Sequence, residues 1–331
     1  MVDKIYQAVV AYNDGSKFSQ TIKDCSLSDL PDNDVLIRVH YSSLNYKDAL
    51  SATGHKGITK QYPFTPGIDA AGVVVYSRST AFKEGDEVIV TSYDLGMNTP
   101  GGFGQYISVP ADWIVPLPKN LSLKESMMIG TSGLTAAIGA YKIMNHSFNS
   151  DNPNVLITGA TGAVGSFSVA LLSHLDLHVT AATGKNDQLD FLKTLGASEV
   201  INRDKVQNVE EHPLLTGKWS AAIDTVGGEM LAAVIRQIKH NGIVACCGNV
   251  LGNQLQTNIL PFILRGITLA GIDSGITLME LRTKIWNRLA EDWKPVNLHK
   301  LSREISFFDL PDEFQKILDG KQVGKVLINL L

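Results

Sequence analysis

The sequence predicts an α/β protein that joins a parallel, doubly wound sheet to a β-rich domain. Two observations lead to this prediction. Short apolar strands alternate with helical segments between residues 155 and 272, and a glycine-rich loop separates the first of these strands from its helix. Strands separated by helices pair in parallel through right-handed crossovers. Six such strands make a complete Rossmann sheet, a fold that binds dinucleotides.

The first third of the chain consists of short apolar runs broken by Gly and Pro. Val35–Val39 alternates apolar and polar residues as a half-buried strand does, and Gly72–Tyr76 and Glu87–Val90 are expected as further strands. This pattern is typical of a compact β-rich domain. The tail from Glu304 to Leu331 returns to short strands around one helix, and we expect it to pack back on that domain.

The pattern changes after Leu121. A helix is expected over Ser122–Tyr141, where Ser122 and Glu125 have the spacing of a capping box. The strands expected after it are Val155–Thr158, His178–Ala182, Glu199–Ile201, Ala221–Thr225, Ile243–Cys247 and Ile267–Ile272. The helices expected among and after these strands are Ala163–Leu175, Gln188–Leu195 and Thr277–Asp292.

Composition excludes several classes of protein. The net charge of -4 and the pI near 6.1 argue against nucleic-acid binding as the main function. The three cysteines, Cys25, Cys246 and Cys247, exclude a disulfide framework and a four-cysteine zinc lobe. The least polar stretch, Val155–Leu175, is interrupted by glycines, and the N-terminal residues lack the apolar core of a secretory signal. We therefore expect no membrane span and a cytoplasmic location.

The strongest local motif is a glycine triplet, Gly159, Gly162 and Gly165, between an apolar strand and an apolar helix. Small residues let the backbone turn sharply and approach a pyrophosphate, and the helix N-terminus offers free amides and a positive dipole end. The strand and helix on either side make the motif credible. The alternative is a generic tight turn between a strand and a helix.

The residues after the second strand indicate which dinucleotide binds. NAD sites usually carry Asp or Glu there, whereas this chain has Thr183, Gly184 and Lys185. A cation and a hydroxyl suit a 2′-phosphate, and Arg203 after the third strand supplies a second cation. We therefore predict NADP(H) as the cofactor. The alternative is that both cations are solvated surface charges.

Ordered motifs along the chain resemble the medium-chain dehydrogenase/reductase family. Those before the glycine loop are Pro66–Gly72, Gly85–Val88, Gly101–Tyr106 and Gly133–Ala136. Finer runs resemble the quinone-oxidoreductase-like branch that contains YhdH and YhfP and is related to acrylyl-CoA reductases; they are Tyr41–Leu50, Ile223–Gly227, Pro261–Arg265 and Gly271–Ser274. The resemblance covers essentially the whole chain.

The resemblance implies a GroES-like substrate domain formed by residues 1–121 and 296–331. It also implies an inserted Rossmann NADP-binding domain at residues 122–295, with the active site between the two. Relatives commonly form homodimers through the edges of their Rossmann sheets. Ile267–Ile272 is the matching strand here, or else an ordinary buried strand.

Zinc-dependent relatives carry a Cys near Asn45 and a His-Glu pair near Ile68 and Asp69. Neither Cys nor His occurs at those places, and Asp69 alone cannot complete a tetrahedral site. We therefore expect no zinc, which leaves hydride delivery to a small-molecule acceptor. That acceptor is either a quinone or a C=C bond next to a carbonyl, such as that of acrylyl-CoA. The alternative is a non-enzymatic NADPH-binding scaffold.

Catalytic candidates cluster in one short run. The resemblance implies that Tyr41 and Asn45 lie near the nicotinamide, where both can donate hydrogen bonds, and Asp48 lies beside them. The alternatives are that Tyr41 is a packed aromatic residue and that Asn45 and Asp48 cap a helix. The remaining cofactor contacts that the resemblance implies are Thr135, Thr161, Gly162, Ala163, Val164, Asn249, Ile263 and Ser274. The alternatives are that Thr135 is simply a helix residue and that Ile263 is ordinary core.

Overall fold

The computed structural model describes residues 4–15, 17–148, 153–207 and 212–331, and the chain divides into two compact units. The first unit comprises Met1–Thr131, Gly275–Glu291 and Ser302–Leu331. The second comprises Ser132–Ser274 and Asp292–Leu301. These bounds differ from the expected ones, because residues 122–131 and 275–291 pack with the first unit and residues 296–301 with the second.

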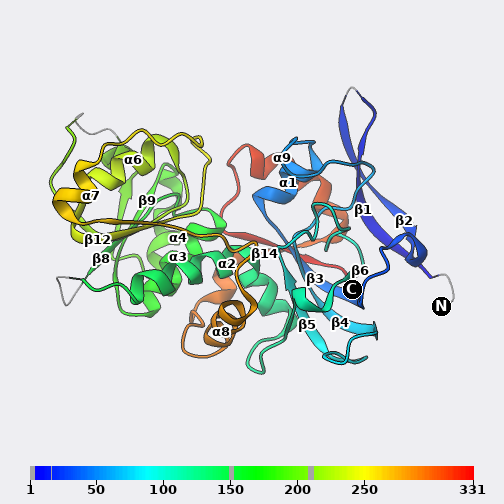
Figure 1. Ribbon diagram of the computed structural model, residues 1–331. Coiled ribbons are helices and arrows are strands. Elements are labelled where there is room, and N and C mark those ends of the chain that lie inside the picture. The colour runs from blue at the N-terminus through cyan, green and yellow to red at the C-terminus, as the bar shows by residue number, and fades with distance from the viewer. Residues whose placement is uncertain (1–3, 16, 149–152, 208–211) are drawn as a thin grey trace. The chain divides into compact units, whose positions relative to one another are not determined.

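The second unit contains a parallel sheet whose described strands follow the order β10-β9-β8-β11-β12-β13 (Figure 1). Its strands are β8 (Asn154–Ile157), β9 (His178–Thr183), β10 (Glu199–Asn202), β11 (Trp219–Asp224), β12 (Ile238–Cys246) and β13 (Thr268–Gly271). This is the strand order of a Rossmann sheet, with its reversal between β8 and β11. The predicted sheet is confirmed, and β13 lies at its edge.

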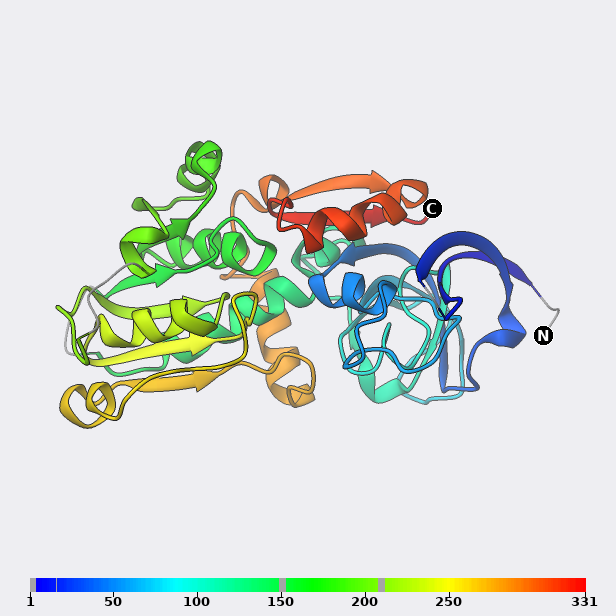
Figure 2. The ribbon, with the colours of Figure 1, turned by 90° about the horizontal axis from the view of Figure 1, so that it is seen from above.

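Helices flank this sheet, and the main segment of the unit can be followed from green to gold in Figure 2. They are α3 (Ala163–His174), α4 (Leu189–Thr194), α5 (Asp204–Gln207), α6 (Gly228–Arg236) and α7 (Leu260–Arg265). Leu156, Val234 and Val244 share one fully buried apolar cluster. Each such side chain contributes roughly 1.5–3 kcal/mol through burial. Within the described part of the chain, no helix is long and apolar enough to cross a membrane.

The first unit is built on a second sheet with the order β14-β15-β3-β4-β5-β7, and β6 also pairs with β3. Its strands are β3 (Val35–Leu44), β4 (Asp69–Ser77), β5 (Glu87–Thr91), β6 (Tyr106–Val109), β7 (Ile114–Pro116), β14 (Ser302–Ser306) and β15 (Lys325–Asn329). A separate hairpin joins β1 (Ile5–Asn13) to β2 (Phe18–Ser26). Because β15 pairs antiparallel with β3, the prediction that the tail packs back on the β-rich domain is confirmed.

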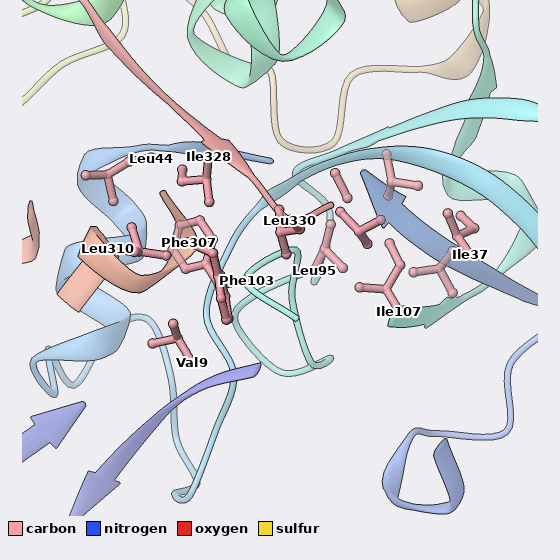
Figure 3. Packing of buried hydrophobic residues seen from close by; sticks show 14 of the residues in the cluster. Val9, Ile37, Leu44, Leu95, Phe103, Ile107, Phe307, Leu310, Ile328 and Leu330 are labelled. Atoms are coloured by element: carbon pink, nitrogen blue, oxygen red, sulfur yellow. The ribbon is translucent and has the colours of Figure 1, made fainter. Parts of the chain in front are cut away.

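The helices of the first unit are α1 (Tyr46–Ala52), α8 (Met279–Ala290), α9 (Leu310–Leu318) and the start of α2 (Leu123–Met144). The capping box of α2 is confirmed, because Ser122 and Glu125 exchange hydrogen bonds of 3.0 and 3.2 Å. Figure 3 shows Phe307 and Leu310 packing toward Leu44 of β3, within a buried apolar cluster that also holds α9.

The guanidinium of Arg282 explains why α8 belongs to the first unit. Arg282 is fully buried and donates to the carbonyl and hydroxyl oxygens of Thr91, at 3.0 and 2.8 Å, and to the carbonyl of Gly275 at 3.1 Å. It also lies 4.5 Å from the ring centroid of Tyr93. A helix with this sequence, MELRTKIWNRLA, gives no local sign that its first arginine is buried.

Candidate active site

A tight loop joins β8 to α3 at the carboxyl edge of the Rossmann sheet. Gly159 has φ +58°, in the left-handed region that favours glycine. A Cβ on Gly165 would collide with the backbone of Gly159, so α3 approaches the loop because residue 165 lacks a side chain. Gly162 is the N-cap, which leaves Ala163 and Val164 in the first turn. Their amides and the helix dipole favour a phosphate at this end.

Polar groups converge after β9. The Thr183 hydroxyl accepts the backbone N–H of Lys185 at 3.0 Å and lies 3.4 Å from the hydroxyl of Thr161. The guanidinium of Arg203 lies over Gly184, since a Cβ there would meet Arg203 Nε at 3.0 Å. Burial lowers the pKa of Lys185. The structure thus brings together the residues predicted to bind the 2′-phosphate.

Two more predicted cofactor residues meet in the second unit. The hydroxyls of Thr135 and Ser274 are 2.6 Å apart, although 139 residues separate them in sequence. Asn249 follows the carboxyl end of β12. Ile263 is 64% exposed on α7, so it is not ordinary core. No hydrogen bond between described residues joins Asn249 or Ile263 to the other predicted contacts.

The catalytic candidates lie in the first unit, around the end of β3. Tyr41 is half-buried between Ala71 and Asn329 on the neighbouring strands, and its hydroxyl makes no hydrogen bond within the described residues. Asn45 is the N-cap of α1, and its backbone N–H donates to Asp48 Oδ2 at 2.7 Å. The capping alternative is therefore confirmed for Asn45 and Asp48, whose catalytic roles stay predictions.

The amide of Asn45 points into a buried polar cluster. Its Oδ1 accepts from Lys325 Nζ at 2.6 Å. Its Nδ2 donates to Asp69 Oδ2 at 2.8 Å, to the carbonyl of Ser43 at 3.2 Å and to Asp48 Oδ2 at 3.3 Å. Both amide hydrogens therefore have acceptors inside the protein.

Asp69 is the centre of this cluster. Its fully buried carboxylate accepts from the hydroxyls of Ser43 and Thr131, both at 2.6 Å, and from the backbone N–H of Thr131. Lys325 Nζ lies 3.3 Å from Asp69 Oδ2. Sequence reasoning missed Lys325, Ser43 and Thr131. Ser43 lies inside the Tyr41–Leu50 run but had no predicted role, and Lys325 and Thr131 belong to none of the motifs. Their shared partner becomes visible only when strands β3, β4 and β15 and helix α2 are placed together.

Burial and neighbouring charges shift the pKa values of these groups. At Asp48, burial and the charge of Asp69 act in the same direction, whereas at Asp69 and Lys325 burial and charge act in opposite directions. Burial, with the neighbouring charge of Asp69, raises the pKa of Asp48 to about 7. Burial alone would also raise the pKa of Asp69, but Lys325 and the hydrogen bonds of Ser43 and Thr131 hold it below its ordinary value. Burial lowers the pKa of Lys325, and the two carboxylates oppose that shift. The cluster thus holds two carboxyl groups of unequal acidity around one ammonium.

Comparison with known proteins identifies the family. Residues 31–119 match the alcohol dehydrogenase GroES-like domain, and residues 163–291 match the zinc-binding dehydrogenase domain. The chain is 42% identical to the putative quinone oxidoreductase YhfP of Bacillus subtilis, over 98% of this chain and 99% of that one. The chain belongs to the medium-chain dehydrogenase/reductase family. It is an oxidoreductase of its quinone-oxidoreductase and acrylyl-CoA reductase branch, in agreement with the resemblance seen in the sequence.

Proteins of this branch include a named acrylyl-CoA reductase and crystal structures with a bound dinucleotide. The acrylyl-CoA reductase AcuI of Ruegeria pomeroyi is 37% identical over 98% of this chain and 99% of its own. The crystal structure of B. subtilis yhfP with NAD bound matches 99% of this chain and 100% of that one, with a TM-score of 0.95 and 42% identity. The yhdH oxidoreductase of Salmonella enterica in complex with NADP matches 98% of this chain and 100% of that one, also at 0.95, with 38% identity.

Proposed function

We propose that this protein is a zinc-independent, NADPH-dependent reductase that delivers hydride to a quinone or to an activated C=C bond such as that of acrylyl-CoA. The observation that carries the proposal is the group of Thr183, Lys185 and Arg203 around the open backbone of Gly184. Two cations and a hydroxyl at this place match the charge and the acceptor oxygens of a 2′-phosphate.

The loop of Gly159, Gly162 and Gly165 fits the rest of the cofactor. A side chain at residue 165 would push α3 away from the turn, and the first turn of α3 aims its amides at the position of a pyrophosphate. The relatives with bound NAD and bound NADP divide on the choice of cofactor. The cations at Lys185 and Arg203 favour NADPH for this chain.

NADPH, when bound, supplies the hydride. Hydride addition to a conjugated acceptor moves an electron pair onto a carbonyl oxygen, which a hydrogen-bond donor then stabilises. Tyr41 is the candidate best placed to donate, since its hydroxyl is unengaged within the described residues while the amide hydrogens of Asn45 have buried acceptors. Zinc-free chemistry is consistent with this donor set, in which Asn45 and Asp69 face an ammonium.

The test of this function is oxidation of NADPH by the purified, EDTA-treated protein with acrylyl-CoA and, separately, with 1,4-benzoquinone. NADH runs beside each acceptor as the cofactor control. Turnover of acrylyl-CoA alone would assign an enoyl-thioester reductase, and turnover of benzoquinone alone a quinone reductase. NADPH binding without turnover of either would refute the proposed reaction and favour the non-enzymatic scaffold.

We also propose a cytoplasmic homodimer joined through the β13 edge. The segment between β12 and β13 exposes apolar side chains that an edge-to-edge contact would bury; they are Val250, Leu251, Leu255, Ile259, Ile263 and Leu264. Light scattering of the purified protein separates a dimer from a monomer, and a monomer would refute this contact.

A further inference from the structure

The register of the first sheet places Lys325 opposite Asn45. Strand β15 pairs antiparallel with β3, and Val326 faces Leu44. Lys325 is the residue before Val326, and Asn45 is the residue after Leu44, so the two side chains meet where β3 ends and β15 begins. The side chain of Lys325 is 2% exposed. A lysine so deeply buried is rare, and its ammonium requires partners inside the protein.

The surroundings of the Asn45 amide fix its orientation. Its oxygen accepts from the ammonium of Lys325, and its nitrogen donates to the carboxylates of Asp69 and Asp48. Rotating the amide by half a turn would place its hydrogens against the ammonium and its oxygen against the carboxylates. Both contacts would then be repulsive, so only the observed orientation satisfies every group.

The ammonium also balances charge. Asp48 and Asp69 are both fully buried, and each has a carboxylate oxygen within hydrogen-bond reach of the same amide nitrogen. Without Lys325, two like charges would share a space that water does not reach, and such a pair resists full ionisation. Lys325 is the described cation that contacts this pair, through Asp69.

We propose that Lys325 is a positioning residue for the reductase. Its buried ammonium fixes the Asn45 amide and the Asp69 carboxylate next to the end of β3, the strand that carries Tyr41. This inference rests on the proposed function, since it needs the end of β3 to lie at the reacting acceptor. Tyr41 pairs with Asn329 on β15, so the strand that supplies Lys325 also borders the proposed donor.

The experiment compares three variants with the wild type, using whichever acceptor the wild type reduces. Lys325→Met removes the charge and keeps the side-chain length. The double variant Lys325→Met/Asp69→Asn removes both charges of the ion pair, which protects the fold against an uncompensated buried carboxylate. Lys321→Met is the matched control, because Lys321 lies on the same unit with a side chain that is 72% exposed.

We expect Lys325→Met to be less stable than the wild type and the double variant to recover part of that stability. In both, kcat should fall by about tenfold to a hundredfold, since small displacements of positioned groups carry such penalties. The KM for NADPH should stay within about twofold, because the residues proposed to bind the phosphates of NADPH lie in the other unit. Lys321→Met should match the wild type in every respect.

A purely structural role predicts a different result. If the folded double variant keeps the wild-type kcat, Lys325 serves stability alone and the inference is overturned. Should Lys325→Met fail to fold, the double variant decides the question by itself. If the wild type turns over neither acceptor, the proposed function is refuted, and this inference is refuted with it. If the wild type is active and the double variant is equally active, only this inference is refuted.

A second readout tests the charge itself. Lys325→Ala lacks the three carbons and the nitrogen of propylammonium, so added propylammonium can restore a cation in the vacated space. We expect it to raise the kcat of Lys325→Ala severalfold over the same concentration of n-propanol, which is similar in size and neutral. Equal effects of the two additives, or no effect of either on the folded variant, would contradict a role for the ammonium.

Discussion

Gly130 packs against the buried polar cluster around Asp69, so Gly130→Ala should destabilise the first unit. It interrupts α2 with φ +51° and ψ −161°, a conformation almost confined to glycine. A Cβ at this position would lie 2.5 Å from Asp69 Oδ2, 2.7 Å from Ser43 Oγ and 3.1 Å from Lys325 Nζ. Those atoms are buried and hydrogen-bonded, so they have little room to move.

Two costs add for Gly130→Ala. The backbone conformation costs roughly 1–3 kcal/mol for a residue with a side chain. Inserting one methyl group into a packed interior costs roughly another 1–3 kcal/mol. We therefore expect a loss near 4 kcal/mol in the free energy of unfolding, about the middle of the combined range. For a unit of this size, that loss lowers Tm by about 8–16 °C.

Scanning calorimetry of three alanine variants separates these costs. Gly85→Ala carries the backbone cost alone, because Gly85 has φ +92° and nothing within 4 Å of its Cβ position. Gly57→Ala carries neither, since Gly57 has no positive φ and its Cβ position is in ordinary van der Waals contact with the His55 ring, at 3.4 Å. A Tm for Gly130→Ala equal to that of Gly85→Ala would refute the claim of tight packing around the cluster.

Three further predictions follow from charged groups in the structure. The pKa of Asp48 is raised from 3.8 to about 7, so the folded state binds this proton more tightly than the unfolded state does. The stability gained in this way is lost as pH rises through about 7. Between about pH 5 and pH 8, the Tm of the wild type should therefore fall more than the Tm of Asp48→Asn. Lys185→Ala/Arg203→Ala should weaken NADPH binding at least about tenfold by calorimetry and leave NADH binding unchanged, and an unchanged NADPH preference would contradict the assigned phosphate site. Arg282→Met should cost about 3–5 kcal/mol in urea unfolding because it orphans buried acceptors. The exposed Arg78→Met should cost less than about 1 kcal/mol, and equal losses would contradict the buried role of Arg282.

Local signals were sufficient for most of the Rossmann unit. The apolar run that ends at Ile157, the turn at Gly159 and the helix from Ala163 are each specified by neighbouring residues, and the structure places them as predicted. The boundary between the units was harder to predict. In the sequence, Arg282 resembles an ordinary polar residue of a surface helix, whereas in the structure it contacts Thr91 and Tyr93, which lie far away in the chain and belong to the first unit.

The sequence likewise predicts only part of the candidate site. Thr183, Gly184 and Lys185 adjoin one another in sequence, and Arg203 follows the next strand, so the fold rule for parallel sheets already brought them together. No such rule predicts the position of Lys325. Its burial depends on pairing between the last strand of the chain and a strand that lies 280 residues earlier, and nothing in the sequence GKVLINLL distinguishes a buried lysine from a solvated one.

Tyr41 and Asn45 differ in whether their hydrogen-bond donors are free to serve a substrate. From sequence alone both were hydrogen-bond donors in one motif, with equal claims on the acceptor oxygen. The structure gives them different neighbours. The Asn45 amide donates its hydrogens to Asp69 and to the carbonyl of Ser43, whereas the Tyr41 hydroxyl makes no hydrogen bond within the described residues. A donor that already satisfies buried carboxylates would break those bonds to serve a substrate, and leaving them unpaired costs more than a new bond returns. Tyr41 pays no such penalty, so Tyr41→Phe should reduce kcat more than any change at Asn45 that leaves the cluster folded.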